Sequence, residues 1–390
     1  MTTTASWHRL AQHTLFYGWI GFLLSFLLFE RTYLVNYFLW AGVLFPTLFV
    51  VRYADLKSYH RSLLINLWCV LILFLLASVF WSGEQTETFA RYLKRAAYLY
   101  GFGLATFLVF DKRRDLDEQF FRWAPLIVAA AALLQIILFY SQHAFPERMT
   151  GPGRLSNPIH FGVVAAAVSI AALLQFGRLS RRMQVLTAAA ILINCAAIYL
   201  CQSRGALLAL VTTLVVSVLF IRRIFPALLV VLIGVAVLAF LLDPATLLER
   251  GVSFRTIIWQ AQWERFWHCP ALIGCGLGVD SGVVIDGQRF DNTHSLYLGW
   301  LLYGGFIGLA GYLVLLGGLI YEGVLLRSHA WTTLLLMGAA STVTSGDNIL
   351  ITPSPYWAVI LIPMVAVLAK VAIAKAAQPV ELGGAAEPAR

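Results

Sequence analysis

Residues 62–81, SLLINLWCVLILFLLASVFW, form one apolar stretch that contains no charged side chain. About 17–25 predominantly apolar residues are enough to cross a bilayer as an α-helix. Only helices and closed barrels satisfy their backbone hydrogen bonds inside a bilayer, and the apolar residues here are continuous rather than alternating with polar ones. The stretch therefore predicts a membrane-spanning helix, and it decides the fold class.

Similar stretches recur along the whole chain. Of its 390 residues, 60% are hydrophobic and 12% are charged, whereas a soluble domain is about half apolar and a quarter charged. We therefore expect an all-α polytopic membrane protein rather than a soluble enzyme. The predicted spans are twelve, at residues 15–29, 33–51, 62–81, 95–110, 123–140, 159–176, 185–202, 205–221, 226–242, 296–320, 331–346 and 356–374.

The chain is expected to form one transmembrane domain over residues 1–375. It includes an outer loop at 243–293, which is too long for a simple connection and is rich in aromatic residues, so we expect it to be folded and to contain short helices. The span at 296–320 carries Gly304-Gly305 and is expected to bend or break there. The first span is expected to be retained, and the Ala/Gly/Pro-rich residues 376–390 to be a disordered cytoplasmic tail.

The basic residues predict the orientation in the membrane. The net charge is +9, and with the N-terminus inside, 17 of the 28 Lys and Arg residues fall on the inner side. Basic residues in short loops favour the cytoplasm, so we expect both termini in the cytoplasm and the 243–293 loop on the outer side of the membrane. Because the orientation in the membrane explains the excess of basic residues, no nucleic-acid partner is expected.

Arginines in the outer segments are candidate ligands for an anion. Residues 254–268, FRTIIWQAQWERFWH, predict a helix on which Arg255 and Trp259 share one face, with Arg265 a further candidate on the same helix. An arginine beside aromatic rings can bind a phosphate. The alternative is an amphipathic helix that its Trp side chains anchor at the membrane surface.

Two more arginines lie in the shorter outer connections. Arg204 sits between two spans, where it is either a ligand for a membrane-bound anion or a side chain that extends to the interface. Arg154 lies among the glycines and prolines of residues 150–158, TGPGRLSNP, which either shape a polar loop over a cavity or form an ordinary turn.

His294, in the segment DNTHSLYL of residues 291–298, is the candidate general base. We expect Asn292 or Thr293 to cap the following helix, whose N-terminus would keep the imidazole neutral. A structural role is the alternative. His143 and His160, which flank the shorter outer loop, are the other candidate histidines, and Asp291 and Asp347 are the first carboxylates to consider as the base.

The five cysteines show no metal-ligand spacing, so no metal site is expected. Cys269 and Cys275 lie six residues apart on the side of the membrane predicted to be oxidising, and a disulfide between them is expected.

Three segments in this order resemble the O-antigen ligase/polymerase superfamily of bacterial envelopes. They cover about residues 203–308. In two places the chain departs from the pattern: Ser295 follows the histidine instead of Asn, and Tyr303 replaces an acidic residue, which leaves the carboxylate that would orient His294 unidentified. The matching segments are Ser203-Arg-Gly-Ala206; Arg255 and Trp259 followed by Cys269-Pro-Ala-Leu-Ile-Gly-Cys-Gly-Leu-Gly278; and His294-Ser-Leu-Tyr-Leu298 with Gly304-Gly-Phe-Ile-Gly308.

The resemblance implies an O-antigen ligase, a glycosyltransferase that works without cofactor, nucleotide or metal. It also implies a location in the bacterial inner membrane, with the active site facing the periplasm. The donor would be a glycan linked to undecaprenyl diphosphate, and the acceptor a sugar hydroxyl of lipid A-core. Arg204 and Arg255 would bind the diphosphate, His294 would remove the acceptor proton, and Arg154, Arg265 and Trp259 would be additional contacts. The alternatives are an O-antigen polymerase, which shares the donor, and a lipid or glycan transporter, which would favour charged residues within the spans.

Overall fold

The computed structural model describes residues 2–83, 86–145, 147–226, 228–230, 232–233 and 254–378. In this part of the chain eight helices are long and apolar enough to cross a bilayer. Apart from one two-stranded hairpin, the regular structure of the described residues is helical. The prediction of an all-α polytopic membrane protein is confirmed.

In the first part of the chain the elements are α1 (Thr2–Leu28), α2 (Thr32–Tyr37), η1 (Phe38–Leu44), α3 (Phe45–Val50), α4 (Tyr53–Tyr59), α5 (Leu63–Ala77), η2 (Ser78–Trp81), α6 (Thr86–Lys112) and α7 (Leu116–Tyr140). They continue with η3 (Gly153–Leu155), α8 (Pro158–Gln175), η4 (Phe176–Arg178), α9 (Arg181–Leu200), α10 (Arg204–Val218) and η5 (Arg222–Ile224). The last part holds α13 (Arg255–Trp267), β1 (Val283–Ile285), β2 (Gln288–Phe290), α14 (Leu296–Leu325), α15 (His329–Thr342), η6 (Trp357–Leu361) and α16 (Ile362–Ala377).

Three further predicted spans coincide with helices that are shorter or more polar. Helices α10 and α15 have 15 and 14 residues. Helix α6 has 27 residues, and it begins at Thr86 rather than near residue 95. The helix therefore extends beyond the predicted span 95–110, because the basic segment before residue 95 is its first part. The predicted span 226–242 and the tail after residue 378 lie largely outside the described residues.

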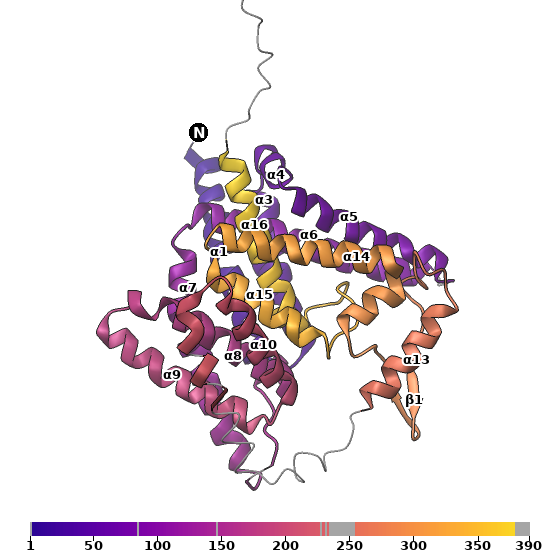
Figure 1. Ribbon diagram of the computed structural model, residues 1–390. Helices are drawn as coiled ribbons and strands as arrows, with labels where there is room; N and C mark the ends of the chain where they lie inside the picture. The colour runs from indigo at the N-terminus through magenta and orange to yellow at the C-terminus, as the bar shows by residue number, and fades with distance from the viewer. Residues whose placement is uncertain are drawn as a thin grey trace, which may run out of the picture.

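Helices α8, α15 and α16 form the centre of the bundle. The spans that contain α8 and α16 are 67% and 78% buried, whereas those of α7 and α9 are each 28% buried. Nearly all of α15 is buried as well. In Figure 1, α15 and α16 run through the middle of the molecule and α9 lies at its edge. The peripheral helices therefore present their apolar side chains to lipid.

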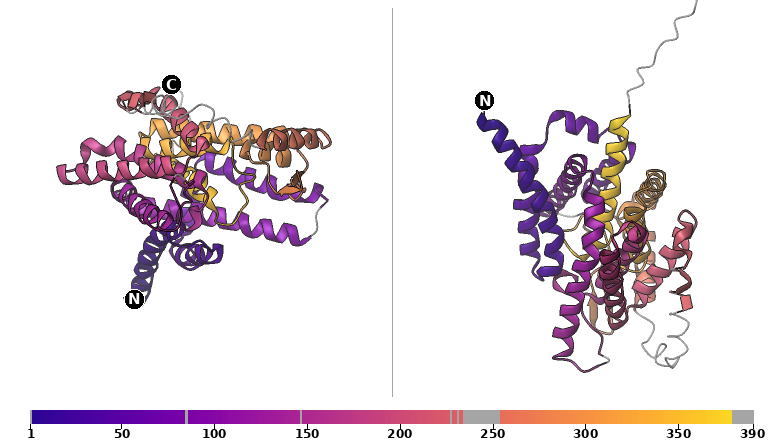
Figure 2. Two further views of the ribbon diagram at one scale, coloured as in Figure 1. Left: turned by 90° about the horizontal axis from the view of Figure 1, so that it is seen from below. Right: turned by 90° about the vertical axis from the view of Figure 1, so that its left-hand side faces the viewer.

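Both ends of the described chain lie on the same side of the molecule. The start of α1 and the end of α16 are at the top of Figure 1 and of the right-hand view in Figure 2. Arg61, in the connection before α5, donates a hydrogen bond to the carbonyl of Ala376. Lys375 forms an ion pair with Glu322 near the end of α14. We call this side the terminal end.

The connections that were predicted to lie outside meet at the opposite end, which we call the loop end. They are joined across the bundle by four hydrogen bonds: Arg148 Nε to Cys201 O (2.9 Å), Leu277 N to Ser78 Oγ (2.8 Å), Leu296 N to Ser345 O (3.1 Å) and Arg95 Nη1 to Leu350 O (3.2 Å). Alternate connections thus gather at opposite ends, as expected when successive spans reverse direction.

The described part of the long outer loop contains α13, which confirms the helix predicted over residues 254–268. It also contains the antiparallel hairpin β1–β2, which was not predicted. The hairpin turn is formed by Asp286 and Gly287, with φ of 51° and 78°, and such pairs of positive φ values fit the twist of a two-residue hairpin. Residues 243–253 lie outside the described part.

Helix α14 is interrupted as predicted. Gly305 has φ 63° and ψ −162°, which is outside the helical region, while the helix continues on both sides of it. A helix can be broken at membrane depth only where other groups satisfy the freed backbone.

Candidate active site

His294 is held in a turn immediately before α14. Its φ is 50°, and its backbone N–H donates to Asn292 Oδ1 at 3.0 Å. The cap of the helix is Ser295, whose hydroxyl accepts from Leu298 N at 3.3 Å. The expected cap at Asn292 or Thr293 was wrong, because the turn at His294 places these residues before the helix, and the Thr293 hydroxyl donates to Ser295 O instead.

Asp347 supplies a carboxylate beside this turn. It lies in the segment between α15 and η6, and its Oδ1 accepts from Tyr303 Oη at 2.8 Å and from Thr293 N at 3.2 Å. Asn348 Nδ2 donates to its other oxygen at 2.8 Å. Tyr303 stands where the superfamily often has an acidic residue, and in this chain it binds a carboxylate that comes from another segment.

Two charged groups and burial set the protonation of His294. Burial lowers its pKa most, the positive charge of Arg255 lowers it further, and Asp347 acts in the opposite direction. Burial in turn raises the pKa of Asp347, against its hydrogen bonds from Tyr303, Thr293 and Asn348. A neutral imidazole within the electrostatic range of a guanidinium and a carboxylate can accept a proton from a hydroxyl group. The structure thus brings Arg255 and His294 together.

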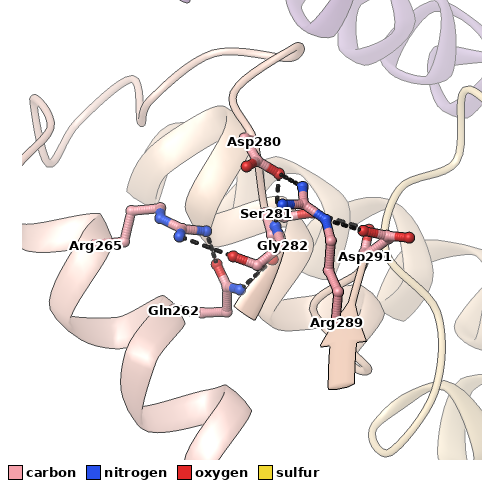
Figure 3. A network of polar contacts seen from close by, with 7 residues as sticks. All are labelled: Gln262, Arg265, Asp280, Ser281, Gly282, Arg289 and Asp291. Carbon is pink, nitrogen blue, oxygen red and sulfur yellow. Dashed lines mark hydrogen bonds and ion pairs between the residues drawn. The ribbon is translucent and has the colours of Figure 1, made fainter. Parts of the chain in front are cut away.

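Arg265, which is on the same helix as Arg255, has a different environment. Its guanidinium donates to Gln262 Oε1 and to the carbonyl of Gly282, each at 3.1 Å, and Gln262 Nε2 donates to Ser281 O at 2.6 Å (Figure 3). These bonds hold α13 against the segment that leads into β1. Arg265 therefore supports the position of α13 rather than facing His294.

A second bridge stiffens the hairpin. Arg289 binds Asp280 at 2.7 Å and Asp291 at 2.5 Å, and Figure 3 shows it between them. The backbone N–H of Gly282, followed by Arg289, lowers the pKa of Asp280. Asp291, one of the alternative bases, is thus occupied by an ion pair in the structure.

Trp259 lies one turn after Arg255 on α13. Its side chain is half-buried, and the indole Nε1 is shielded without a hydrogen-bond partner among the described residues. A buried N–H group of this kind can donate to a bound ligand.

Arg204 is the first residue of α10, which Ser203 caps through a 3.2 Å bond from Ala206 N to its hydroxyl. A β-carbon on the next residue, Gly205, would lie 3.6 Å from Thr344 Oγ1. The start of α10 therefore abuts the segment that carries Asp347. Arg204 belongs to the same end of the molecule as His294, and its side chain is exposed.

Arg154 lies on another side of this end. Gly153 packs against the last turn of α1, where a β-carbon would be 2.6 Å from the carbonyl oxygen of Leu27. Burial lowers the pKa of Arg154 and the charge of Glu30 raises it. The described interactions thus associate Arg154 with α1 and not with His294.

The other outer histidines have protein contacts. The ring of His160 is buried against Tyr356 at a centroid distance of 4.6 Å, and that of His143 stacks on Phe139 at 4.2 Å. His268 caps the C-terminus of α13.

In the structure Cys269 and Cys275 are joined by a disulfide. It closes the loop between α13 and the hairpin, and this loop contacts the break in α14.

No family model matches the chain. A protein of Pseudomonas aeruginosa named O-antigen ligase is 27% identical to it over 304 residues, which make up 75% of this chain and 73% of that protein. This homologue, together with the polytopic helical fold, supports a relationship of the chain to the O-antigen ligase family.

Proposed function

We propose that the chain is an O-antigen ligase that transfers a glycan from undecaprenyl diphosphate to a sugar hydroxyl of lipid A-core. The homologue named O-antigen ligase supports a role in lipopolysaccharide biosynthesis and a glycosyltransferase activity. The observation that carries the finer proposal is the environment of His294 at the loop end: the histidine is half-buried, the charge of Arg255 lowers its pKa, and Asp347 binds the backbone of the preceding residue, Thr293.

The reaction is a single displacement at the anomeric carbon of the donor. Arg255 and Arg204 bind the diphosphate and stabilise the charge that develops as the bond between the anomeric carbon and the phosphate oxygen breaks. His294 takes the proton of the acceptor hydroxyl while its oxygen forms the new glycosidic bond. The anomeric configuration is inverted, and the diphosphate leaves on its lipid without nucleotide or metal.

Asp347 stabilises the imidazolium that results. A carboxylate near a histidine base favours the protonated ring after the transfer. The hydrogen bond from the backbone N–H of Thr293 connects this carboxylate to the residue before His294, and Tyr303 donates to the same oxygen.

A cavity beside the bundle fits the lipid part of the donor. It measures about 330 Å³, and apolar side chains of α1, α7 and α8 line most of it. Leu27 and Leu155 line it next to Arg154, which we assign as an additional contact to the donor, apart from the diphosphate that Arg204 and Arg255 bind.

We infer that the loop end faces the periplasm and that both termini are cytoplasmic. Asp286, at the exposed hairpin turn, is the position for a test. After the free cysteines Cys69, Cys195 and Cys201 are replaced by Ser, a Cys at position 286 should react with a membrane-impermeant maleimide in cells with an intact inner membrane. A Cys at the exposed Lys57, near the terminal end, should react only after that membrane is opened, and the reverse pattern would invert the topology.

The function is tested with purified protein, a lipid-linked glycan and lipid A-core, in a buffer with chelator and without nucleotide. The expected product is lipid A-core that carries the glycan, visible as a shifted band on a gel. The same reaction with the His294→Ala variant is the control. Elongation of the lipid-linked glycan when lipid A-core is left out would identify a polymerase instead.

A further inference from the structure

The break in α14 leaves backbone groups that the helix itself does not satisfy. At Gly305 the chain leaves the helical region, so carbonyl groups before it and N–H groups after it lose their partners one turn away. Within a bilayer these groups require replacements from the protein.

The loop that follows α13 supplies the replacements. Residues 269–276, which we call the disulfide loop, both donate to and accept from the broken helix. The four bonds are Cys275 N to Leu302 O (2.7 Å), Gly276 N to Tyr303 O (3.1 Å), Phe306 N to Ala271 O (3.0 Å) and Ile307 N to Leu272 O (3.1 Å).

The two segments meet backbone against backbone. A β-carbon on Gly305 would lie 2.4 Å from the carbonyl carbon of Leu272, and one on Gly274 would lie 2.5 Å from Gly305 N. Both glycines also have positive φ, 63° and 71°. The loop therefore fits into the break only because neither position carries a side chain.

The disulfide closes this loop on itself. Cys275 is bonded to Cys269 and also makes the first of the four hydrogen bonds to α14. Within the loop, Gly274 N donates to Pro270 O at 2.8 Å. A short covalent ring restricts the conformations that the loop can adopt when it is released from the helix.

The break leads directly to the candidate active site. Tyr303 lies two residues before Gly305, and its hydroxyl donates to Asp347, which also accepts from the backbone of Thr293 beside His294. The rotation of α14 at the break thus decides where the Tyr303 hydroxyl lies.

We infer that the disulfide loop is a positioning element of the active site, which holds α14 broken at Gly305 and so keeps Tyr303 on Asp347. For its effect on catalysis this inference rests on the proposed function. It gives one physical purpose to residues 270–276, which carry Pro270, Gly274 and Gly276, and to the glycine block at 304–308, although the two lie far apart in the chain.

A double-mutant cycle tests the inference. The change of Cys269 and Cys275 to Ser, and separately Tyr303→Phe, should each lower the turnover of glycan transfer about tenfold, the scale of one lost hydrogen bond to a charged group. Combined, they should lower it little further, because both act through the same contact to Asp347. If the combined variant instead lost about a hundredfold in turnover, the two changes would act independently, and the inference would be overturned.

Cys195→Ser is the matched control, since Cys195 is a free cysteine outside the loop. It should change turnover less than about twofold, as surface substitutions away from such contacts usually do. Mass spectrometry of alkylated, non-reduced protein should show the linked Cys269–Cys275 peptide. Free thiols at both positions in protein made in its native envelope would also overturn the inference.

Hydrogen exchange provides a measurement that does not depend on transfer. The amides of Phe306 and Ile307 are bonded to the loop, so they should exchange faster in the double Ser variant than in the wild type or in Cys195→Ser. Unchanged exchange would contradict the inference even if the protein transfers glycan. If wild-type protein transfers nothing while these amides respond, the proposed function fails and the coupling of loop and break stands.

Discussion

The His294→Ala variant is expected to transfer glycan about 10²–10⁴-fold more slowly than the wild type, the range that a positioned general base contributes. It should still bind the lipid-linked donor, because the arginines bind the diphosphate. Turnover under saturating donor and acceptor, together with donor binding to the detergent-solubilised protein, measures the two effects separately. His143→Ala is the control, since His143 stacks on Phe139 in another outer connection.

The identity of the base is decided by His294→Gln. Glutamine can hold a hydrogen bond in place of the imidazole, but it cannot take the proton. Substantial activity in this variant would show that His294 only positions the acceptor, and the base would then have to be another group.

The pH dependence follows from the groups that face His294. A base works in its neutral form, so the rate falls as the pH decreases through the pKa of His294, which lies below the usual value for histidine. Arg255→Ala removes a charge that lowers this pKa, so the acid limb of the rate profile should move to higher pH. Asp347→Asn removes a charge that raises it, and the limb should move to lower pH.

Arg204→Ala and Arg255→Ala are each expected to weaken transfer about ten- to a hundredfold, since a charge-assisted contact to phosphate contributes about 1.5–3 kcal/mol. Lysine at either position should restore little if the guanidinium binds two phosphate oxygens. Rates at several donor concentrations show whether the loss is in binding or in turnover.

Arg178→Ala is the matched control, because Arg178 is an exposed arginine between α8 and α9, away from the loop end. It should leave transfer unchanged. Wild-type transfer in both Arg204→Ala and Arg255→Ala would show that these side chains only extend to the membrane surface.

The sequence identified most residues of the candidate site, but it did not predict which of them lie close together. Arg255 and His294 each lie in a recognisable local pattern, and the structure places them in each other's electrostatic range. The neutral state of His294 was expected from a helix N-terminus, whereas the structure attributes it mainly to burial and to Arg255. Arg265 shares the helix of Arg255 but is bonded to Gly282, which depends on the fold of the hairpin.

Asp347 illustrates what the sequence leaves open. It follows Tyr303 by 44 residues, in a segment without a distinctive pattern. The sequence shows only that the acidic residue often found at position 303 is missing. In the structure Tyr303 binds the carboxylate of Asp347, which lies after the C-terminal end of α15. This contact depends on two distant segments of the chain that meet in space.

The sequence by itself determined the membrane class, the helix over residues 254–268 and the break at Gly305. These depend on runs of apolar residues, on helical periodicity and on a glycine pair, which act over a few turns of one segment. Only the tertiary structure decided that the disulfide loop fills the break and that Tyr303 holds Asp347 beside Thr293. Such contacts join distant segments, so they follow from how the helices pack and where freed backbone groups find partners rather than from any local pattern.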